Sequence, residues 1–285
     1  MSIVANAYKL LVAQGAKDEN LEAVLFTHVS TLRAVFNVLA SIECSSKLWN
    51  CSKDHDNIKE SVFDTRPIFG APSIFARRSR LQAELYRFAT DPARPGTPAR
   101  VLTDVNIKSV DPSAGVVVAD SGDTYIGDLI VGADGINSAV RGAVLAYSSD
   151  PASESGSVVG VSEGTAAVPT GLAGYTSVVP AGIIASDPDL AFQAAEGVGG
   201  ICHWQGPEGS QLRVLCYPCD NKEYFQIFGY VPETSWKEQF ERDKTSIIRG
   251  IPAERVLKDF ETFHPVVKKL LGYANSAGHH AGLLF

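Results

Sequence analysis

The sequence has no excess of basic residues, no long apolar run and few cysteines. Its 25 Lys and Arg are outnumbered by 32 Asp and Glu, for a net charge of −7. This balance argues against nucleic acid or an anionic membrane as a partner. No apolar run is long enough to cross a bilayer, and no basic segment precedes an apolar core near residue 1. We therefore expect a cytoplasmic protein without a transmembrane segment, able to bury one or two cores.

The cysteines give no sign of a disulfide scaffold. Five cysteines, an odd number in a chain of 285 residues, fit reduced thiols. Cys216 and Cys219 have the spacing of a redox or zinc pair, but a zinc site needs a second pair, and Cys202 with His203 is a poor substitute. Both cysteines end a strand pattern, so we interpret them as a buried strand and turn and predict no metal site.

Apolar periodicity predicts a chain of mixed α/β (α+β) class. The expected helical segments are 3–15, 21–50, 78–90 and the last 50 residues. Strands are expected at 100–110, 115–120 and 124–131, and then at 157–163, 173–185, 199–205, 211–217 and 223–230. The later strands follow one another between Gly and Pro turns, which favours a mostly antiparallel sheet. A polar run at 148–157 marks a soft boundary.

The segment Asp128-Leu-Ile-Val-Gly-Ala-Asp-Gly-Ile-Asn-Ser-Ala-Val-Arg141 carries the most functional information. Its apolar start predicts a strand covered on both faces, and its glycines allow a tight turn into a helix near residue 139. Asn137 or Ser138 can cap that helix. Asp134 would then lie where strand gives way to helix, a common ligand crevice of α/β sheets. A carboxylate there can accept hydrogen bonds from ribityl or ribose hydroxyls, and the helix N-terminus favours phosphate.

This segment resembles the second flavin fingerprint of the FAD-dependent aromatic hydroxylases, the group of salicylate and p-hydroxybenzoate hydroxylases. It matches every fixed position of the motif Asp-x-x-x-Gly-Ala-Asp-Gly-x-x-Ser-x-Val-Arg. The resemblance implies that Asp134 and Gly135 contact the FAD hydroxyls and phosphate. We expect Arg141 to support the motif helix rather than to contact substrate.

A second stretch, residues 75–85, is similar to the family's His-Arg-x-x-Leu-x-x-x-Leu helix start. Arg78 falls on the arginine that contacts FAD in the family, and Arg77 replaces the usual histidine. Taken without the family, the arginines of this helix could equally form a solvated basic face.

The C-terminal half also resembles the family. The stretch 212–219 looks like its "YP" strand in the substrate-binding domain. On the expected strands, Tyr217 and His203, and with them Tyr175, are weak candidates for binding a phenolate, and no catalytic residue is otherwise identified.

Two outer pieces of the family's flavin site have no counterpart in the sequence. These are the opening Gly-x-Gly-x-x-Gly turn and the later Gly-Asp-Ala-Ala-His segment. We therefore expect residues 1–150 to form an incomplete, Rossmann-like FAD-binding domain that carries the GADG motif. Residues 151–285 are expected to form a substrate-binding sheet domain with C-terminal helices.

The resemblance implies a monooxygenase that uses FAD, NAD(P)H and O2 to hydroxylate an aromatic or polyketide-like small molecule. One alternative is a truncated or non-catalytic relic unable to hold FAD. Another is a serine hydrolase, because Gly160-Val-Ser-Glu-Gly164 fits a nucleophile elbow around Ser162. The residues after Ser162 make a poor helix, with Pro169 and Gly171 close behind, so this alternative has little support. The sequence does not indicate an oligomeric state.

Overall fold

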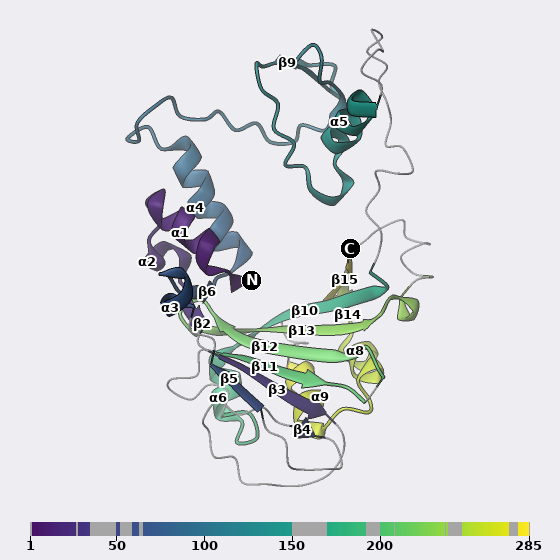
Figure 1. The fold of residues 1–285 in the computed structure, drawn as a ribbon. Coiled ribbons are helices and arrows are strands. Elements are labelled where there is room, and N and C mark those ends of the chain that lie inside the picture. Colours follow the sequence, from purple (N-terminus) through teal and green to yellow (C-terminus); the bar gives the residue numbers. More distant parts are fainter. Residues whose placement is uncertain are drawn as a thin grey trace. The chain divides into compact units, whose positions relative to one another are not determined.

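The computed structural model describes residues 2–26, 28–34, 50–51, 59–62, 65–149, 170–191, 200–207, 209–236, 238, 247–273 and 279–284. The chain forms two compact units (Figure 1). The first combines Met1–Pro98 with Gly171–Leu284, and the second consists of Ala99–Thr170 together with Phe285. The first unit is thus assembled from two stretches that are far apart in the sequence.

A nine-stranded sheet dominates the first unit (Figure 1). Its order is β14-β15-β10-β13-β12-β11-β3-β4, and β5 also pairs with β3. The ladder from β15 through β10, β13 and β12 to β11 is antiparallel, as predicted, whereas β3 joins β11 in parallel. The strands are β3 (His28–Ala34), β4 (Asn50–Cys51), β5 (Lys59–Val62), β10 (Leu172–Pro180), β11 (Ile201–Gln205), β12 (Arg213–Cys219), β13 (Tyr224–Pro232), β14 (Ile247–Ile251) and β15 (His279–Leu284).

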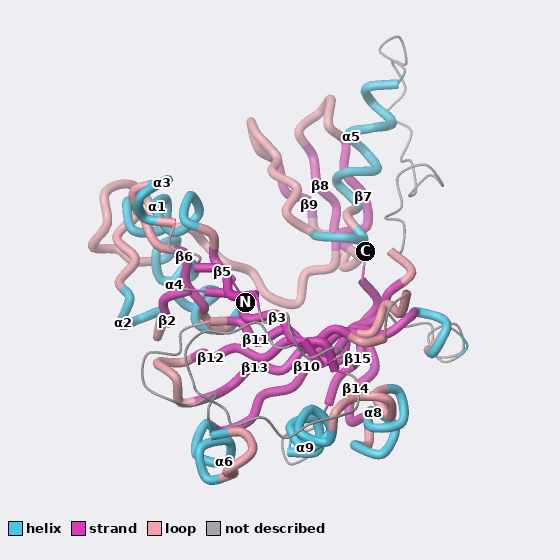
Figure 2. Tube along the Cα trace, turned by 60° about the horizontal axis from the view of Figure 1, so that its bottom comes forward, coloured by secondary structure: helices cyan, strands magenta, loops and turns pink. Residues whose placement is uncertain are grey.

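The helices α6 (Ala181–Ser186), α8 (Ala253–Asp259) and α9 (Pro265–Tyr273) cover one face of this sheet (Figure 2). Side chains on β10–β13 alternate between buried and half-buried, because successive residues of a strand point to opposite faces. The buried set packs on these helices in the largest apolar core of the described chain. Cys216 and Cys219 are both buried on β12, as the strand-and-turn interpretation predicts.

A polar network inside this core fixes Tyr175 as a structural residue. Its hydroxyl donates to Asp259 Oδ2 at 2.5 Å and accepts from Trp236 Nε1 at 2.8 Å. Arg255 pairs with Asp259 and lies over the Trp236 ring. Since Tyr175 is fully buried, its weak candidacy as a phenolate ligand was wrong. Because successive side chains of a strand point to opposite faces, Tyr175 lies on the buried face of β10 and Thr176 lies on the other face.

A small three-stranded sheet completes the first unit, in the order β1-β6-β2. Its strands are β1 (Ser2–Ile3), β2 (Val24–Phe26) and β6 (Ser73–Phe75). Its helices are α1 (Ala5–Ala13), α2 (Asp18–Leu21), α3 (Arg66–Phe69) and α4 (Arg78–Thr90). The ring of Phe75 stacks on Tyr217 of β12 with 4.8 Å between centroids, which ties the small sheet to the large one.

The second unit is a three-stranded meander followed by a helix. It contains β7 (Ile107–Asp111), β8 (Val116–Ala119), β9 (Thr124–Ile126), the 3₁₀ turn η1 (Gly135–Asn137) and α5 (Ala139–Ser149). Few of the apolar side chains described in this unit are buried. Among residues 99–149 they are Val110, Ala119 and Ala143.

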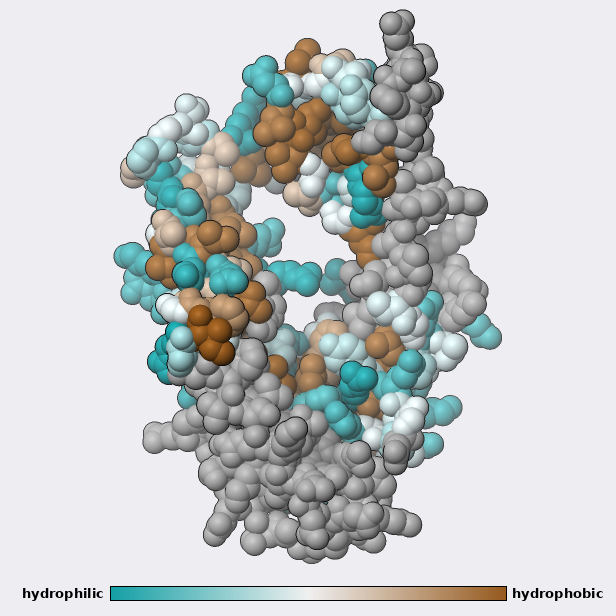
Figure 3. Space-filling model, viewed as in Figure 1, coloured by the Kyte–Doolittle hydropathy of each residue, from teal (hydrophilic) through white to brown (hydrophobic). Residues whose placement is uncertain are grey.

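The prediction of a buried strand over 124–131 was wrong. Strand β9 ends at Ile126, and Ile126, Leu129 and Val131 are 81%, 81% and 76% exposed. In the described part of the chain no strand pairs with residues 128–131, so Leu129 and Val131 remain exposed, while Ile130 is half-buried. Figure 3 shows apolar surface on this unit, where Figure 1 labels β9 and α5.

Some of the other predicted helices and strands are confirmed and some were wrong. The helix predicted at 78–90 is confirmed as α4, and the one at 3–15 is confirmed in α1. The helical prediction for 21–50 was wrong where residues are described, because β2 and β3 lie there. The last 50 residues contain strands β14 and β15 beside helices α8 and α9. His279 and His280 lie in β15. The strand expected at 157–163 lies outside the described residues.

Within the described ranges, no helix is both long and apolar enough to cross a bilayer.

Candidate cofactor turn and sheet face

The GADG segment folds into a turn that is closed by its own aspartate. Asp134 Oδ1 accepts a hydrogen bond from Ser138 Oγ at 2.6 Å, and Asp134 Oδ2 accepts from the amides of Ala139 at 2.7 Å and Val140 at 3.3 Å. Ser138 Oγ in turn accepts from the amide of Arg141 at 2.9 Å, so Ser138 is the N-cap of α5, one of the two caps predicted. The first-turn amides of α5 are therefore already paired, and the prediction that they bind phosphate has no geometric support here.

The carboxylate of Asp134 stays ionised in this arrangement. The hydrogen bond from Ser138 is the main cause that holds the pKa of Asp134 below its usual value, and the amides of Val140 and Ala139 act in the same direction. Asp134 is exposed, and a carboxylate has about four lone-pair positions, of which three are used here. It can therefore still accept a hydrogen bond from a hydroxyl that approaches from solvent.

Two glycines make the turn possible. A Cβ on Gly132 would lie 2.6 Å from both Cβ and Cγ1 of Val140, so only glycine permits this approach of the chain to α5. Gly135 has φ +74°, the left-handed conformation that favours glycine, and nothing lies within 4 Å of the position of its missing Cβ. The backbone at Gly135 is thus open to a ligand.

Arg141 supports the turn, as predicted. Its Nη2 donates to the carbonyl of Ile136 at 2.6 Å, and Nη1 reaches that of Gly135 at 3.5 Å. The guanidinium is therefore committed to the 3₁₀ turn before α5.

Arg78 begins α4 and differs from the other arginines of that stretch. Arg77 donates to the buried Asp220 at 2.6 Å, Arg80 pairs with Glu22 at 2.5 Å, and Arg87 pairs with Glu84 at 2.9 Å. Arg78 is exposed and has no ion pair or hydrogen bond with any residue that the structure describes. The solvated basic face is therefore not an adequate description of α4, because its other arginines serve structural pairs and Arg78 alone is available to an anion.

The half-buried face of the large sheet holds His203 and Tyr217. The strand register places Leu215 between His203 and Phe228, and Arg213 between Gln205 and Tyr230. Burial, and to a lesser degree the nearby Arg213, lower the pKa of His203 to about 4, so its imidazole is neutral at pH 7. His203 Nε2 is buried without a hydrogen-bond partner among the described residues.

Tyr217 is less available than His203. Its ring stacks on Phe75, and burial raises its pKa well above the ordinary value. A phenol this buried is a packing residue at the junction of the two sheets. That His203 or Tyr217 binds a ligand remains a prediction.

The structure brings only some of the predicted residues together. Arg78, His203 and Tyr217 belong to the first unit, whereas Asp134 and Gly135 belong to the second. Each set has its own local geometry. The prediction that Arg78 and Asp134 share one flavin site remains a prediction.

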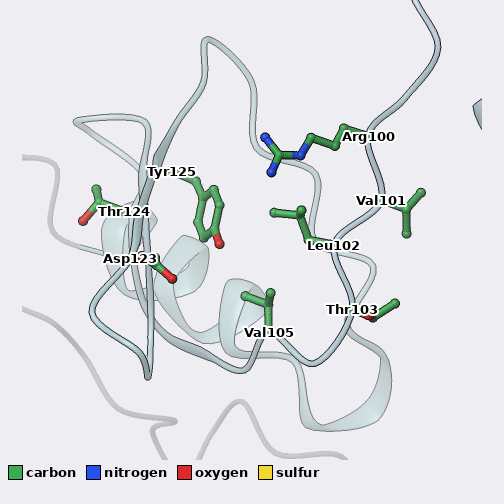
Figure 4. Close-up of a pocket in the computed structure, with 8 residues that line it drawn as sticks. All are labelled: Arg100, Val101, Leu102, Thr103, Val105, Asp123, Thr124 and Tyr125. Carbon is green, nitrogen blue, oxygen red and sulfur yellow. The ribbon is translucent and has the colours of Figure 1, made fainter.

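Sequence reasoning did not single out the hollow in the second unit (Figure 4). This open hollow of about 590 Å³ lies between residues 100–105 and the start of β9. The guanidinium of Arg100 and the side chain of Leu102 point toward the ring of Tyr125, whereas Val101 and Thr103 point away. The residues that line this hollow belong to no motif recognised in the sequence, and none of the predicted site residues is among them.

The remaining sequence candidates gain nothing from the structure. Ser162 lies outside the described residues. Asp187, an acid that follows Ser162 in the order found in hydrolases, is buried and already accepts hydrogen bonds from Lys269 at 2.8 Å and Tyr273 at 2.6 Å. Across the described ranges there is no group of three or more His, Cys, Asp or Glu that could hold a metal ion.

Comparison with known proteins points to one group of enzymes. No family model matches the chain. It is 26% identical over 225 residues to hispidin-3-hydroxylase of Neonothopanus nambi, which covers 75% of this chain and 48% of the relative. It is also 26% identical over 207 residues to the FAD-dependent monooxygenase phomE' of Diaporthe leptostromiformis, over 72% of this chain and 48% of the relative. The chain thus spans about half the length of these curated relatives.

Solved structures share the fold. A salicylate hydroxylase in complex with substrate superposes with a TM-score of 0.60 at 18% identity, over 100% of this chain and 60% of that one. The 2,6-dihydroxypyridine-3-hydroxylase of Arthrobacter nicotinovorans superposes with a TM-score of 0.63 at 11% identity, over 100% and 61%. At these identities the likeness concerns the fold, which is the mixed α/β class predicted from the sequence.

Proposed function

The chain is a relative of the FAD-dependent aromatic hydroxylases, and from this premise we propose that it acts in an FAD-dependent, NAD(P)H-using monooxygenase. The proposed substrate is an aromatic or polyketide-like small molecule, with O2 as the second substrate. When bound, FAD would take electrons from NAD(P)H and supply the oxygen chemistry that no side chain can. The curated relatives support the proposal, because one is named a hydroxylase and the other an FAD-dependent monooxygenase.

The geometry of the GADG turn is the observation that connects the proposal with residues of this chain. Asp134 is ionised, exposed and fixed by Ser138, and it keeps room for a further hydrogen bond. Gly135 beside it leaves its backbone uncovered. A fixed acceptor next to open backbone fits a ribityl or ribose hydroxyl. Asp134 and Gly135 would therefore hold the hydroxyl-bearing part of FAD.

Arg78 would hold an anionic or planar part of the same cofactor. Its guanidinium is unpaired within the described chain and stands at the N-terminus of a 13-residue helix. Both the charge and the helix terminus favour a phosphate group. A planar guanidinium also suits stacking on a flavin ring.

The test is flavin binding by the purified chain. After incubation with FAD and removal of free ligand, the protein should retain an absorbance band at about 450 nm, a general property of flavins. Arg78→Gln should weaken FAD binding about tenfold, which corresponds to about 1.4 kcal/mol. Arg80→Gln is the matched control, because Arg80 lies on the same helix but is paired with Glu22.

Two results would oppose the proposal. If the wild-type chain retains no flavin, this chain does not hold the cofactor. If Arg78→Gln and Arg80→Gln weaken binding equally, Arg78 has no particular role. Asp134→Asn is a poor first variant because it also disturbs the cap of α5.

A further inference from the structure

The turn that joins β12 to β13 holds a buried acid beside the start of α4. Asp220 follows β12 directly and is 1% exposed. Its Oδ2 atom accepts a hydrogen bond from Arg77 at 2.6 Å, although the two residues are 143 positions apart in the sequence. Arg77 is the residue directly before α4. The ion pair therefore connects this helix to the large sheet.

The buried carboxylate of Asp220 depends on Arg77 for its compensation. Within the described ranges its Oδ1 atom is buried without a hydrogen-bond partner, and Oδ2 carries the ion pair with Arg77. A buried charge is costly unless it is paired, and a hydrogen bond between two ions is about twice as strong as one between neutral groups. The guanidinium of Arg77 also lies over the ring of Tyr224, 5.4 Å from its centroid. Two residues of the same hairpin thus hold Arg77.

The backbone of this hairpin is itself restrained. Asp220, Asn221 and Lys222 have φ values of +49°, +50° and +69°, which lie in the left-handed region. Residues other than glycine persist there only where the surrounding contacts hold them. The amide of Asn221 donates to the carbonyl of Glu22 at 3.1 Å, and the amide of Glu223 donates to the carbonyl of Asp220 at 2.8 Å. These bonds restrain the place of the Asp220 carboxylate.

Arg77 extends this restraint to the first turn of α4. Its carbonyl accepts hydrogen bonds from the amides of Arg80 and Leu81, both at 3.1 Å. Arg78 is the first residue of the helix and lies inside the turn that these bonds close. The other ion pair of this turn joins Arg80 to Glu22, whose side chains are 46% and 23% exposed, so water weakens it. The buried pair made by Arg77 is therefore the stronger anchor of the turn.

We propose that Asp220 is a positioning residue, which fixes the first turn of α4 through Arg77 and so sets where Arg78 meets the cofactor. The inference rests on the proposed function in taking FAD as the partner of Arg78. Arg77 stands where the family motif has histidine, so this ion pair belongs to this chain and not to the motif. Asp220 acts through Arg77 and does not itself bind FAD. By charge alone an acid opposes the binding of an anionic ligand nearby, so the direction of its effect separates positioning from electrostatics.

The first measurement is hydrogen–deuterium exchange of α4 without FAD. Asp220→Asn keeps the shape of the side chain and an acceptor for Arg77, and asparagine adopts the left-handed backbone readily. The variant removes the charge from the pair, so the amides of Arg80 and Leu81 should exchange several-fold faster than in the wild type. Amides in the second half of α4 should be unchanged. Arg77→Lys keeps the ion pair and should stay close to the wild type.

The second measurement is the affinity for FAD, which is titrated into each purified variant. Asp220→Asn should weaken binding about fivefold, although the loss of a negative charge by itself favours an anion. In the Arg78→Gln background the same substitution should change little, because the side chain that it positions is gone. A merely structural role would give the same loss in both backgrounds. Glu84→Gln is the matched control, because Glu84 is also a buried carboxylate paired with an arginine of α4, Arg87, but lies beyond the first turn.

Four results would overturn the proposal. The exchange of the first turn is unchanged in Asp220→Asn, FAD binding is unchanged or tighter in that variant, the loss is equal with and without Arg78, or Glu84→Gln weakens FAD binding equally. A wild type that holds no FAD contradicts the proposed function instead, and the exchange measurement then decides alone whether Asp220 fixes the first turn of α4. Circular dichroism of each variant shows that the fold is retained.

Discussion

The carboxylate of Asp134 accepts a 2.6 Å hydrogen bond from the hydroxyl of Ser138, while that hydroxyl accepts the amide of Arg141. The aspartate that the flavin fingerprint assigns to a cofactor is thus also the residue that organises its own turn. Any variant of Asp134 therefore changes two things, the ligand contact and the start of α5. Ser138 offers a way to separate them.

Ser138→Ala should loosen α5 by about 1 kcal/mol, the usual cost of losing a serine N-cap. Both the amide of Arg141 and the Oδ1 atom of Asp134 lose a partner in this variant. Hydrogen–deuterium exchange of residues 139–149 measures the effect. Ser113→Ala is the control, because Ser113 bonds to Asp111 in another turn of the same unit. Equal protection of α5 in wild type and Ser138→Ala would contradict the capping role.

Gly132→Ala should destabilise the second unit by about 1–3 kcal/mol through overpacking. The added Cβ would lie 2.6 Å from Val140 Cβ, which is closer than carbon atoms approach in proteins. The double variant Gly132→Ala/Val140→Ala should recover part of the loss, because the clash is specific to that pair. Urea unfolding of the wild type, Gly132→Ala, Val140→Ala and the double variant measures the coupling free energy between the two positions. Strictly additive losses would show that Gly132 is needed for another reason.

Tyr175→Phe should lower the free energy of unfolding by about 1–3 kcal/mol, since Trp236 Nε1 and Asp259 Oδ2 both lose a buried partner. Thermal unfolding is a sufficient measurement. Tyr217→Phe is the comparison, because that ring stacks on Phe75 and its hydroxyl has no hydrogen bond with the described residues. We expect Tyr217→Phe to change stability by less than about 0.5 kcal/mol. Similar losses in both variants would argue against a specific role for the Tyr175 network.

Glu84 makes stability depend on acid pH. It is buried, and its hydrogen bonds from Arg87, the main cause, and from Asn20 lower its pKa from 4.5 to about 2. Because the folded pKa is the lower one, the stabilisation is complete above about pH 4.5 and is lost as pH falls toward 2. Glu84→Gln should therefore be less stable than wild type at pH 7 and closer to it at pH 3.

Urea unfolding at the two pH values measures this difference. Glu19→Gln is the control, because Glu19 pairs with Lys17 only at the exposed surface. A gap between wild type and Glu84→Gln that is the same at both pH values would contradict the assignment.

The sequence predicted this fold best where local signals and tertiary packing agree. Helix α4 was found because its apolar positions follow a helical period, and β12 and β13 because theirs alternate. Strand β3 was missed, since a strand inside a large sheet is defined by partners remote in the sequence. The exposure of Leu129 and Val131 was equally hidden, because an apolar run predicts a strand without showing whether a neighbour covers it.

The candidate site was also predictable only where a local sequence signal exists. A motif of fixed letters identified Asp134, Gly135 and Arg78, and the turn around Asp134 has a geometry compatible with that interpretation. No motif marks the hollow beside Tyr125. Its lining comes from residues 100–105 and 123–125, which the fold alone brings together.

The order of the large sheet has a consequence for how the chain folds. Strands β3 and β11 are parallel neighbours in the sheet, although more than half of the chain lies between them in the sequence. Strand β10 pairs with β13 on one side and with β15, about a hundred residues later in the sequence, on the other. Such non-local pairings make folding slow, because long loops must close before their contacts form. During synthesis, β10 cannot gain its second partner until β15 has been made, so one edge of β10 stays unpaired in the meantime.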